Sequence, residues 1–353
     1  MVRETVLMAI SLATHKRLWG NAGRLCAYPG CGQPLLIPME TGEDEFLIGK
    51  ECHIIAKADS GPRNPTSLSD EEAKRWKPLV DDRDSYGNLI LLCGVHHDVI
   101  DGDVAAHSVA MLVEMKRTHE RIVSEQQPPN ARQEEDLQVR YASIVDEWAR
   151  RIVIDRWDGR MSRLVSDAAI QEEVLEELER VRMWLLSRVW PRTIPALEAA
   201  FFNFRLVAED MEAVTVHFSS SRNGLLLVDR VYQEVGYGVS SENHEFLKRR
   251  SEYHQDLVAD LAVELTRAVN LICDRVRAHL WPSYRLDEGR TTIGLGINSS
   301  LVYQTLVPLY EPNCPDVPYP GLREFLSERA DRDWARGTGS PPKGAGVPGL
   351  GDS

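Results

Sequence analysis

The sequence has no long hydrophobic run, which argues against a helical membrane protein. The longest apolar stretch near its beginning, residues 6–13, is much shorter than the about 20 residues that a membrane-spanning helix needs. This stretch continues directly into His15, Lys16 and Arg17 without the small residues of a signal-peptidase site. We therefore expect a cytoplasmic protein with no membrane partner.

The chain also lacks an excess of positive charge. Its 353 residues include 41 Lys and Arg against 54 Asp and Glu, which gives a formal net charge of -13. The first 125 residues and the remainder are both net negative. This balance argues against a protein that binds nucleic acid over its whole surface. It is compatible with a local basic patch, or with a site where bound metal ions supply the positive charge.

Cysteine is scarce, yet four of the six cysteines lie within the first 93 residues. In a chain without a secretory signal, paired cysteines indicate metal binding more often than disulfides. Cys26 and Cys31 enclose a Tyr-Pro-Gly turn, which brings two thiolates close together, and Cys93 precedes His96 by three residues. The two pairs together predict a structural zinc site with four tetrahedral ligands, Cys26, Cys31, Cys93 and His96.

Apolar spacing and turn residues predict an α+β protein with two domains. The expected elements of the first part are a helix over 4–18, a strand–turn–strand unit within 33–58, an apolar strand over 86–93, a helix from His96 and a helix over 108–124 capped by Ser108. The segment Gln126–Asn130 contains two prolines and predicts a break. We therefore expect a first domain over 1–126 and a linker over 127–132.

The second part is expected to be a mostly helical regulatory or oligomerisation domain over 133–335. Its expected elements are helices over 133–157, 167–190 and 252–280, and a β-hairpin over 291–309. Asn270 lies inside the longest of these helices, where we expect it to make a hydrogen bond in the core. Residues 336–353 are rich in Gly and Pro and predict a disordered tail.

Three polar residues of the first part follow one another in an order that predicts chemistry. His53 follows Cys52 at the end of an expected strand, Asn88 precedes the next strand, and His97 lies on the helix after it. In this order, interleaved with the split zinc site, the sequence resembles the HNH endonucleases, or ββα-metal nucleases, and their zinc-knuckle subset. The resemblance covers about residues 15–122. It implies a small ββα-metal domain in which His53 is the general base, Asn88 orients its loop and His97 binds a catalytic metal ion.

The resemblance also implies further ligands for this ion, which would be Mg²⁺, Mn²⁺, Ni²⁺ or Zn²⁺. Asp101 lies four residues after His97 and so on the same helix face, where some family members carry a second ligand. The residue before the base is often a His or Asp ligand in this family, whereas here it is Cys52. Three roles are open for Cys52: a small buried residue, a ligand of the catalytic ion, or a replacement for His96 in the zinc site.

The expected partner is DNA. Lys57 and Arg63 follow the catalytic strand and are candidates for contacts with the DNA backbone. The segments Ile48–Ile54, Gly61–Arg63 and Asn88–Cys93 resemble the HNH effector nucleases of bacterial anti-phage defence. That resemblance implies a second domain that restrains the nuclease until an activating ligand or partner protein binds. The long helices favour a homo-oligomer, since a double-strand cut needs two active sites.

A second class of function is compatible with the same residues. The chain would then be a non-catalytic zinc-knuckle adaptor that docks on DNA and binds a partner protein through its helical part. Cys52 and the negative charge of the first part favour this alternative. The presence of both His53 and His97 favours the enzyme.

Overall fold

The computed structural model describes residues 10–38, 45–234, 240–297, 300–337, 341 and 345–348. Its contacts divide the chain into two compact units, Met1–Asp146 and Glu147–Ser353. The division falls inside helix α6 (Pro129–Ile152), later than the boundary that we expected after residue 126. The expected linker over 127–132 largely belongs to this helix, because a proline in the first helical turn has no hydrogen bond to lose.

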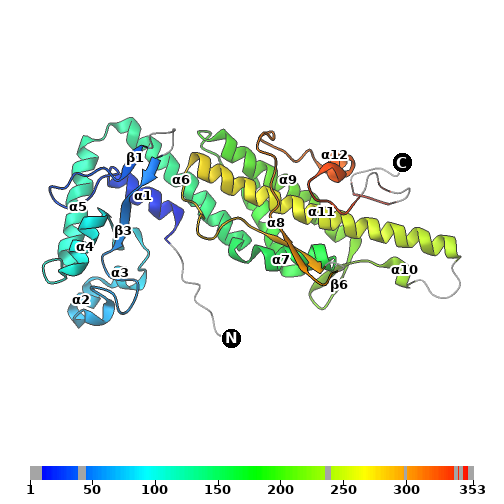
Figure 1. Ribbon diagram of the computed structural model, residues 1–353, viewed down its shortest axis with the longest axis horizontal. Coiled ribbons are helices and arrows are strands. Elements are labelled where there is room, and N and C mark those ends of the chain that lie inside the picture. Colours follow the sequence, from blue (N-terminus) through cyan, green and yellow to red (C-terminus); the bar gives the residue numbers. More distant parts are fainter. Residues whose placement is uncertain are drawn as a thin grey trace. The chain divides into compact units, whose positions relative to one another are not determined.

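The first unit contains short strands and helices (Figure 1). Its strands are β1 (Leu36–Pro38), β2 (Glu45–Leu47), β3 (Gly49–His53) and β4 (Leu89–Cys93). Its helices are α1 (Leu12–Asn21), α2 (Asp70–Arg75), α3 (Lys77–Asp81), α4 (Gly94–Gly102), α5 (Val109–Gln126) and the first part of α6, with 3-10 turns η1 (Pro65–Ser67) and η2 (Tyr86–Asn88). The expected strand–turn–strand unit is confirmed by the antiparallel pair β1 and β2, although its expected turn at Thr41 lies outside the described residues. The expected helix over 4–18 corresponds to α1, and its first residues also lie outside them.

Strands β3 and β4 form an antiparallel pair that is followed at once by α4. His53 at the end of β3 pairs with Leu89 at the start of β4, and Gly49 pairs with Cys93. Every residue of β4 is buried, as its continuous Leu-Ile-Leu-Leu-Cys run requires. The last residue of the strand, Cys93, keeps an extended backbone and stands at the N-cap of α4. The chain therefore brings the end of β3 and the start of α4 to opposite ends of one small sheet.

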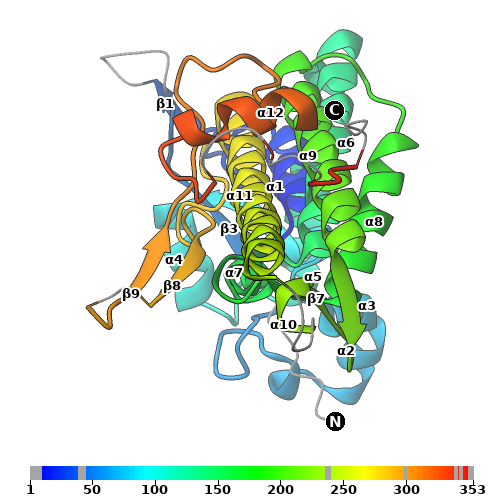
Figure 2. The same ribbon diagram turned by 90° about the vertical axis from the view of Figure 1, so that its right-hand side faces the viewer.

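The second unit is mainly helical, and a long central helix organises it (Figures 1 and 2). Its further helices are α7 (Trp157–Ser166), α8 (Glu172–Leu186), α9 (Pro195–Phe218), α10 (Val231–Glu234), α11 (Ser241–His279) and α12 (Leu322–Glu328), with 3-10 turns η3 (Ile154–Arg156) and η4 (Arg329–Asp331). Its strands are β5 (Ala169–Gln171), β6 (Ser219–Arg222), β7 (Leu225–Val228), β8 (Ile293–Ile297) and β9 (Tyr303–Leu306). Helix α11 packs against α9 and α7 through the predicted apolar stripe, which is buried from Leu257 to Val276.

Several boundaries in this unit differ from the expected ones. The helix expected over 133–157 ends at Ile152, because Val153 adopts a left-handed conformation (φ 51°) that interrupts it. The helix expected from 167 begins at Glu172, after strand β5. Strands β5, β7 and β6 form a small antiparallel sheet that we did not expect, since strands of three or four residues leave almost no periodic signal.

Buried polar groups hold the last part of the chain against α11. The expected hydrogen bond of Asn270 is confirmed: its Nδ2 donates to Thr291 O and Pro308 O, 3.0 and 2.9 Å away. Its Oδ1 accepts from both Thr291 N and Oγ1. The hairpin expected over 291–309 is formed by β8 and β9.

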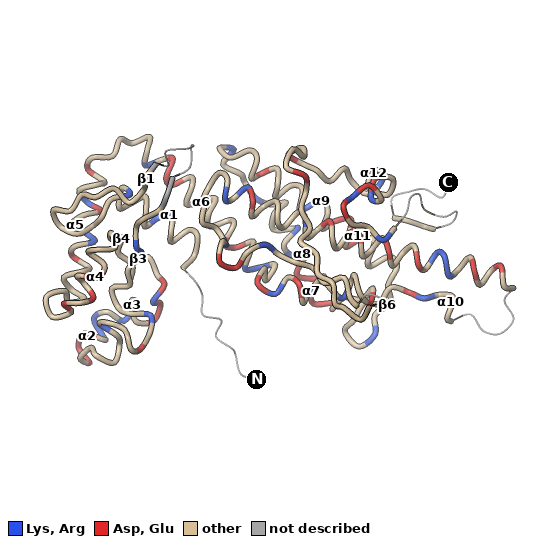
Figure 3. The backbone as a smooth tube through the Cα atoms, viewed as in Figure 1, with Lys and Arg blue, Asp and Glu red and all other residues tan. Residues whose placement is uncertain are grey.

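The described part of the expected disordered tail also makes specific contacts. The backbone N–H groups of Arg336 and Gly337 donate to the carboxylate of Asp260, and Ala345 O accepts from His254. No helix in the described ranges is long and apolar enough to cross a membrane. Acidic and basic residues are interspersed along the chain in both units (Figure 3).

Candidate metal centre and catalytic site

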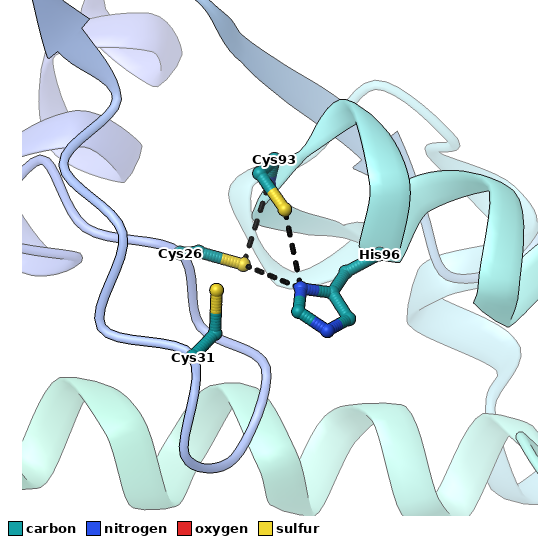
Figure 4. Close-up of side chains that lie close together, drawn as sticks. All are labelled: Cys26, Cys31, Cys93 and His96. Carbon is teal, nitrogen blue, oxygen red and sulfur yellow. Dashed lines mark hydrogen bonds between the residues drawn. The ribbon is translucent and has the colours of Figure 1, made fainter.

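The four predicted zinc ligands come together in the first unit (Figure 4). Cys26 and Cys31 lie on the turn before β1, Cys93 ends β4, and His96 is in the first turn of α4. Their ligand atoms lie within 4.8 Å of one another. Two thiolates bound to one tetrahedral zinc are about 3.8 Å apart, so this cluster could hold a metal ion such as zinc.

Neighbouring groups orient the cluster. His96 Nδ1 lies 3.1 Å from the Sγ of Cys93 and 3.6 Å from that of Cys26, so this nitrogen faces the sulfur atoms. The backbone N–H of Cys93 donates to Cys26 Sγ at 3.3 Å, as expected for an atom that carries negative charge when it binds metal. The ring of Tyr28 stacks on His96 with centroids 4.0 Å apart and fixes the imidazole plane.

Burial raises the pKa of the Cys26 thiol to about 12, and the adjacent thiols of Cys31 and Cys93 add to the effect. A buried thiolate is therefore unfavourable unless a cation lies beside it. A divalent ion bound by thiolates supplies that charge, and its binding must release protons.

Asn88, the predicted loop-orienting residue, is completely buried and makes three hydrogen bonds. Its Nδ2 donates to Ile55 O and to Arg83 O, both at 2.8 Å, and its Oδ1 accepts from Ile55 N at 2.9 Å. The Asn88 amide thus links the segment after His53, at Ile55, to the segment before Asn88, at Arg83.

His53, the predicted base, has a partner that the sequence did not indicate. Its Nε2 lies 3.0 Å from Oδ1 of Asp84, whose Oδ2 accepts from Lys57 Nζ at 2.6 Å. Burial raises the pKa of Asp84, but the contacts with Lys57 and His53 outweigh this and hold it below its usual value. Asp84 is therefore a carboxylate, and 22% of the His53 side chain stays exposed. Asp84 has no motif around it, and only the fold brings it to His53.

His97 and Asp101 face each other on α4, as their spacing predicts. His97 Nε2 and Asp101 Oδ2 are 3.6 Å apart, a separation that two ligands of one cation can have. His97 Nδ1 lies 3.1 Å from the carboxylate of Asp98, which would fix the proton on Nδ1 and leave Nε2 for a metal. Both side chains are one-third exposed, so an ion can reach them from solvent.

Cys52 belongs to neither metal group within the described residues. The only group of three or more metal-ligating side chains found there contains His96 and not Cys52. This arrangement removes the need for Cys52 as a zinc ligand. Cys52 is buried, its Sγ contacts Lys50 O at 3.4 Å, and burial raises the pKa of its thiol well above the usual range. These properties favour the role of a small neutral core residue.

The prediction that Arg63 contacts the DNA backbone is wrong for this conformation. Arg63 is buried, with its Nε donating to Ile54 O at 2.9 Å and its NH1 donating to Ile100 O at 2.7 Å. Its NH2 donates to Oδ1 of Asp101 at 2.7 Å, which leaves Oδ2 directed at His97. Arg63 therefore positions Asp101. Lys57, the other predicted DNA contact, is one-third exposed and is paired with Asp84.

Comparison with known proteins adds no assignment. No model of a known protein family matches the sequence, and no curated protein sequence is significantly similar to it.

Proposed function

We propose that this protein is a metal-dependent endonuclease that hydrolyses DNA phosphodiester bonds in an HNH-type site. One observation carries the proposal. A partly exposed histidine at the end of β3 and a His–Asp pair on α4 flank a two-stranded sheet, and the buried Asn88 links the loops beside it by hydrogen bonds. Phosphodiester hydrolysis needs a base for water and a cation for the phosphate, and these two groups match those needs.

His53 is the base in this proposal. Its imidazole takes a proton from a water molecule, the water oxygen bonds to phosphorus, and the bond from phosphorus to the 3′ oxygen breaks. The leaving oxygen is protonated from solvent. Asn88 holds the loop after His53 through Ile55, so the imidazole is presented in one position.

His97 and Asp101 would hold the catalytic ion. A divalent cation there would stabilise the charge that builds on the phosphate and on the leaving oxygen. No third His, Cys, Asp or Glu side chain of the described residues forms a metal-ligating group with these two, so water and substrate oxygens would complete the shell. Arg63 keeps Asp101 in place from the buried side.

The zinc cluster supports the site mechanically in this proposal. Cys93 ends β4 and His96 opens α4, so a zinc ion would fix the junction between the sheet and the helix that carries His97. The second unit would regulate the nuclease or assemble it into an oligomer, which suits an enzyme of anti-phage defence that must not cut host DNA freely.

Plasmid cleavage tests the proposal. The full chain and His53→Ala are incubated with supercoiled plasmid in EDTA, Mg²⁺, Mn²⁺, Ni²⁺ or Zn²⁺, with His279→Ala as a control on an exposed histidine of α11. We expect metal-dependent nicking or linearisation by the wild type and the control, and at least a 100-fold lower rate for His53→Ala. Equal cleavage by His53→Ala would refute His53 as the base. Metal-independent DNA binding without cleavage, unaffected by His53→Ala, would favour the adaptor.

A further inference from the structure

We propose that Asp84 is the positioning residue for His53, forming with it a His–Asp pair that sets which ring nitrogen acts as the base. This inference rests on the proposed nuclease function and deepens it. Asp84 lies in the loop before η2, far from β3 in sequence, and its Oδ1 is 3.0 Å from His53 Nε2. Neither composition nor motif order pointed to this residue.

The chemistry of the two groups fixes the direction of the hydrogen bond. An ionised carboxylate can only accept, so Nε2 of His53 must carry the proton and donate it to Asp84. The lone pair of the neutral ring is then on Nδ1, which makes no hydrogen bond within the described part of the chain. Nδ1 is therefore the atom that takes the proton from water. Asp84 stabilises the imidazolium that results, because a negative charge then lies beside the positive ring.

The pair is held by a framework that an accidental surface contact would not have. The buried Asn88 donates to Arg83 O, directly before Asp84, and to Ile55 O, two residues after His53. The Arg83 side chain also donates to Lys57 O and to the carboxylate of Asp59, which ties the same two segments again. His53 and Asp84 are thus presented to each other by two cross-links between their loops.

Lys57 completes the arrangement. Its ammonium donates to Oδ2 of Asp84 at 2.6 Å, while Oδ1 faces His53. The ion pair prevents the carboxylate from rotating and keeps it ionised, so that it always accepts from the imidazole. The role of Lys57 in this arrangement is therefore to orient Asp84.

The test compares Asp84→Ala with Asp81→Ala in the full chain. Asp81 ends α3 and makes only an exposed ion pair with Lys77, so it controls for the loss of one carboxylate near the site. We expect kcat for plasmid cleavage to fall at least about tenfold in Asp84→Ala with KM nearly unchanged, since the residue acts on the base and not on DNA binding. Asp84→Asn keeps an acceptor oxygen without the charge, and we expect an intermediate rate.

A spectroscopic measurement separates this inference from the proposed function. In the wild type, proton NMR should show a downfield, slowly exchanging ring N–H signal that disappears in His53→Ala and in Asp84→Ala but persists in Asp81→Ala. If no protein cleaves DNA with any ion, the nuclease proposal fails, and the NMR signal still reports on the pair. Absence of the signal in the wild type would overturn the inference. Cleavage by Asp84→Ala at the wild-type rate would also overturn the inference. Faster cleavage would do the same, because Asp84 would then shield His53 from the substrate.

Discussion

Replacing Asn88 with Ala is expected to destabilise the loops of the proposed site strongly, although it removes only one amide group. The amide makes three buried hydrogen bonds, two to carbonyl groups and one from the Ile55 N–H. Each is worth about 1 kcal/mol net, and the variant leaves all three backbone partners unpaired. We therefore expect the free energy of local opening around Ile55 to fall by about 3 kcal/mol, a roughly 100-fold higher opening equilibrium.

Hydrogen–deuterium exchange measures this directly. The Ile55 amide loses its acceptor in Asn88→Ala, so a peptide covering residues 54–57 should exchange about 100-fold faster than in the wild type. Asn64→Ala is the matched control, because Asn64 caps the exposed turn η1 through its side chain and does not touch this loop. Its exchange over 54–57 should match that of the wild type.

A second variant identifies which half of the amide matters. Asn88→Asp keeps an acceptor for the Ile55 N–H but places a carboxylate against the carbonyl oxygens of Ile55 and Arg83. Since an ionised carboxylate cannot donate, we expect Asn88→Asp to exchange at least as fast as Asn88→Ala at neutral pH. Wild-type protection in either variant would refute the assignment of Asn88 as the link between the two loops.

Four further outcomes follow from the structure. We expect about one zinc per chain by mass spectrometry, lost in Cys93→Ser together with the thermal stability of the first unit. Because burial raises the pKa of Cys26 to about 12, zinc affinity measured against a chelating dye should fall as the pH is lowered. Arg63→Ala should cost about 3 kcal/mol in urea unfolding yet leave the salt dependence of DNA binding unchanged, whereas loss of a phosphate contact would reduce that slope by about one. Burial lowers the pKa of His254 to about 4, so the stability that its neutral form contributes above pH 6.5 should be lost as the pH falls from 6.5 towards 4. In His254→Phe, the midpoint of urea unfolding should depend less on pH over this range. An unaltered pH dependence in the variant would exclude His254 as its source.

The cluster of Cys26, Cys31, Cys93 and His96 could be predicted from the sequence because its information is local. The two residues of each ligand pair lie close together in sequence, and Cys93 ends the continuous apolar run that marks β4 as a buried strand. The i, i+4 spacing of His97 and Asp101 likewise fixes a common helix face before any tertiary contact is known.

Arg63 and Asp84 could not be assigned because their partners are distant in sequence. Arg63 follows Gly-Pro in a polar segment and looks like an exposed residue. It is buried because a left-handed backbone (φ 52°) directs it toward acceptors from Ile54, Ile100 and Asp101. Asp84 is one of several acidic residues in its loop, and only its contacts with His53 and Lys57 distinguish it.

The segment between β3 and β4 should tolerate changes in its length. Strand pairing between His53 and Leu89, the Asn88 amide and the Arg83 side chain close the two ends of the intervening chain onto each other. The residues between about 68 and 81, which include α2 and α3 and follow the buried Arg63, are then part of a loop whose ends are already fixed, and lengthening such a loop costs little entropy. This segment is therefore where we expect insertions, deletions or grafted recognition modules to be tolerated without moving the proposed catalytic groups.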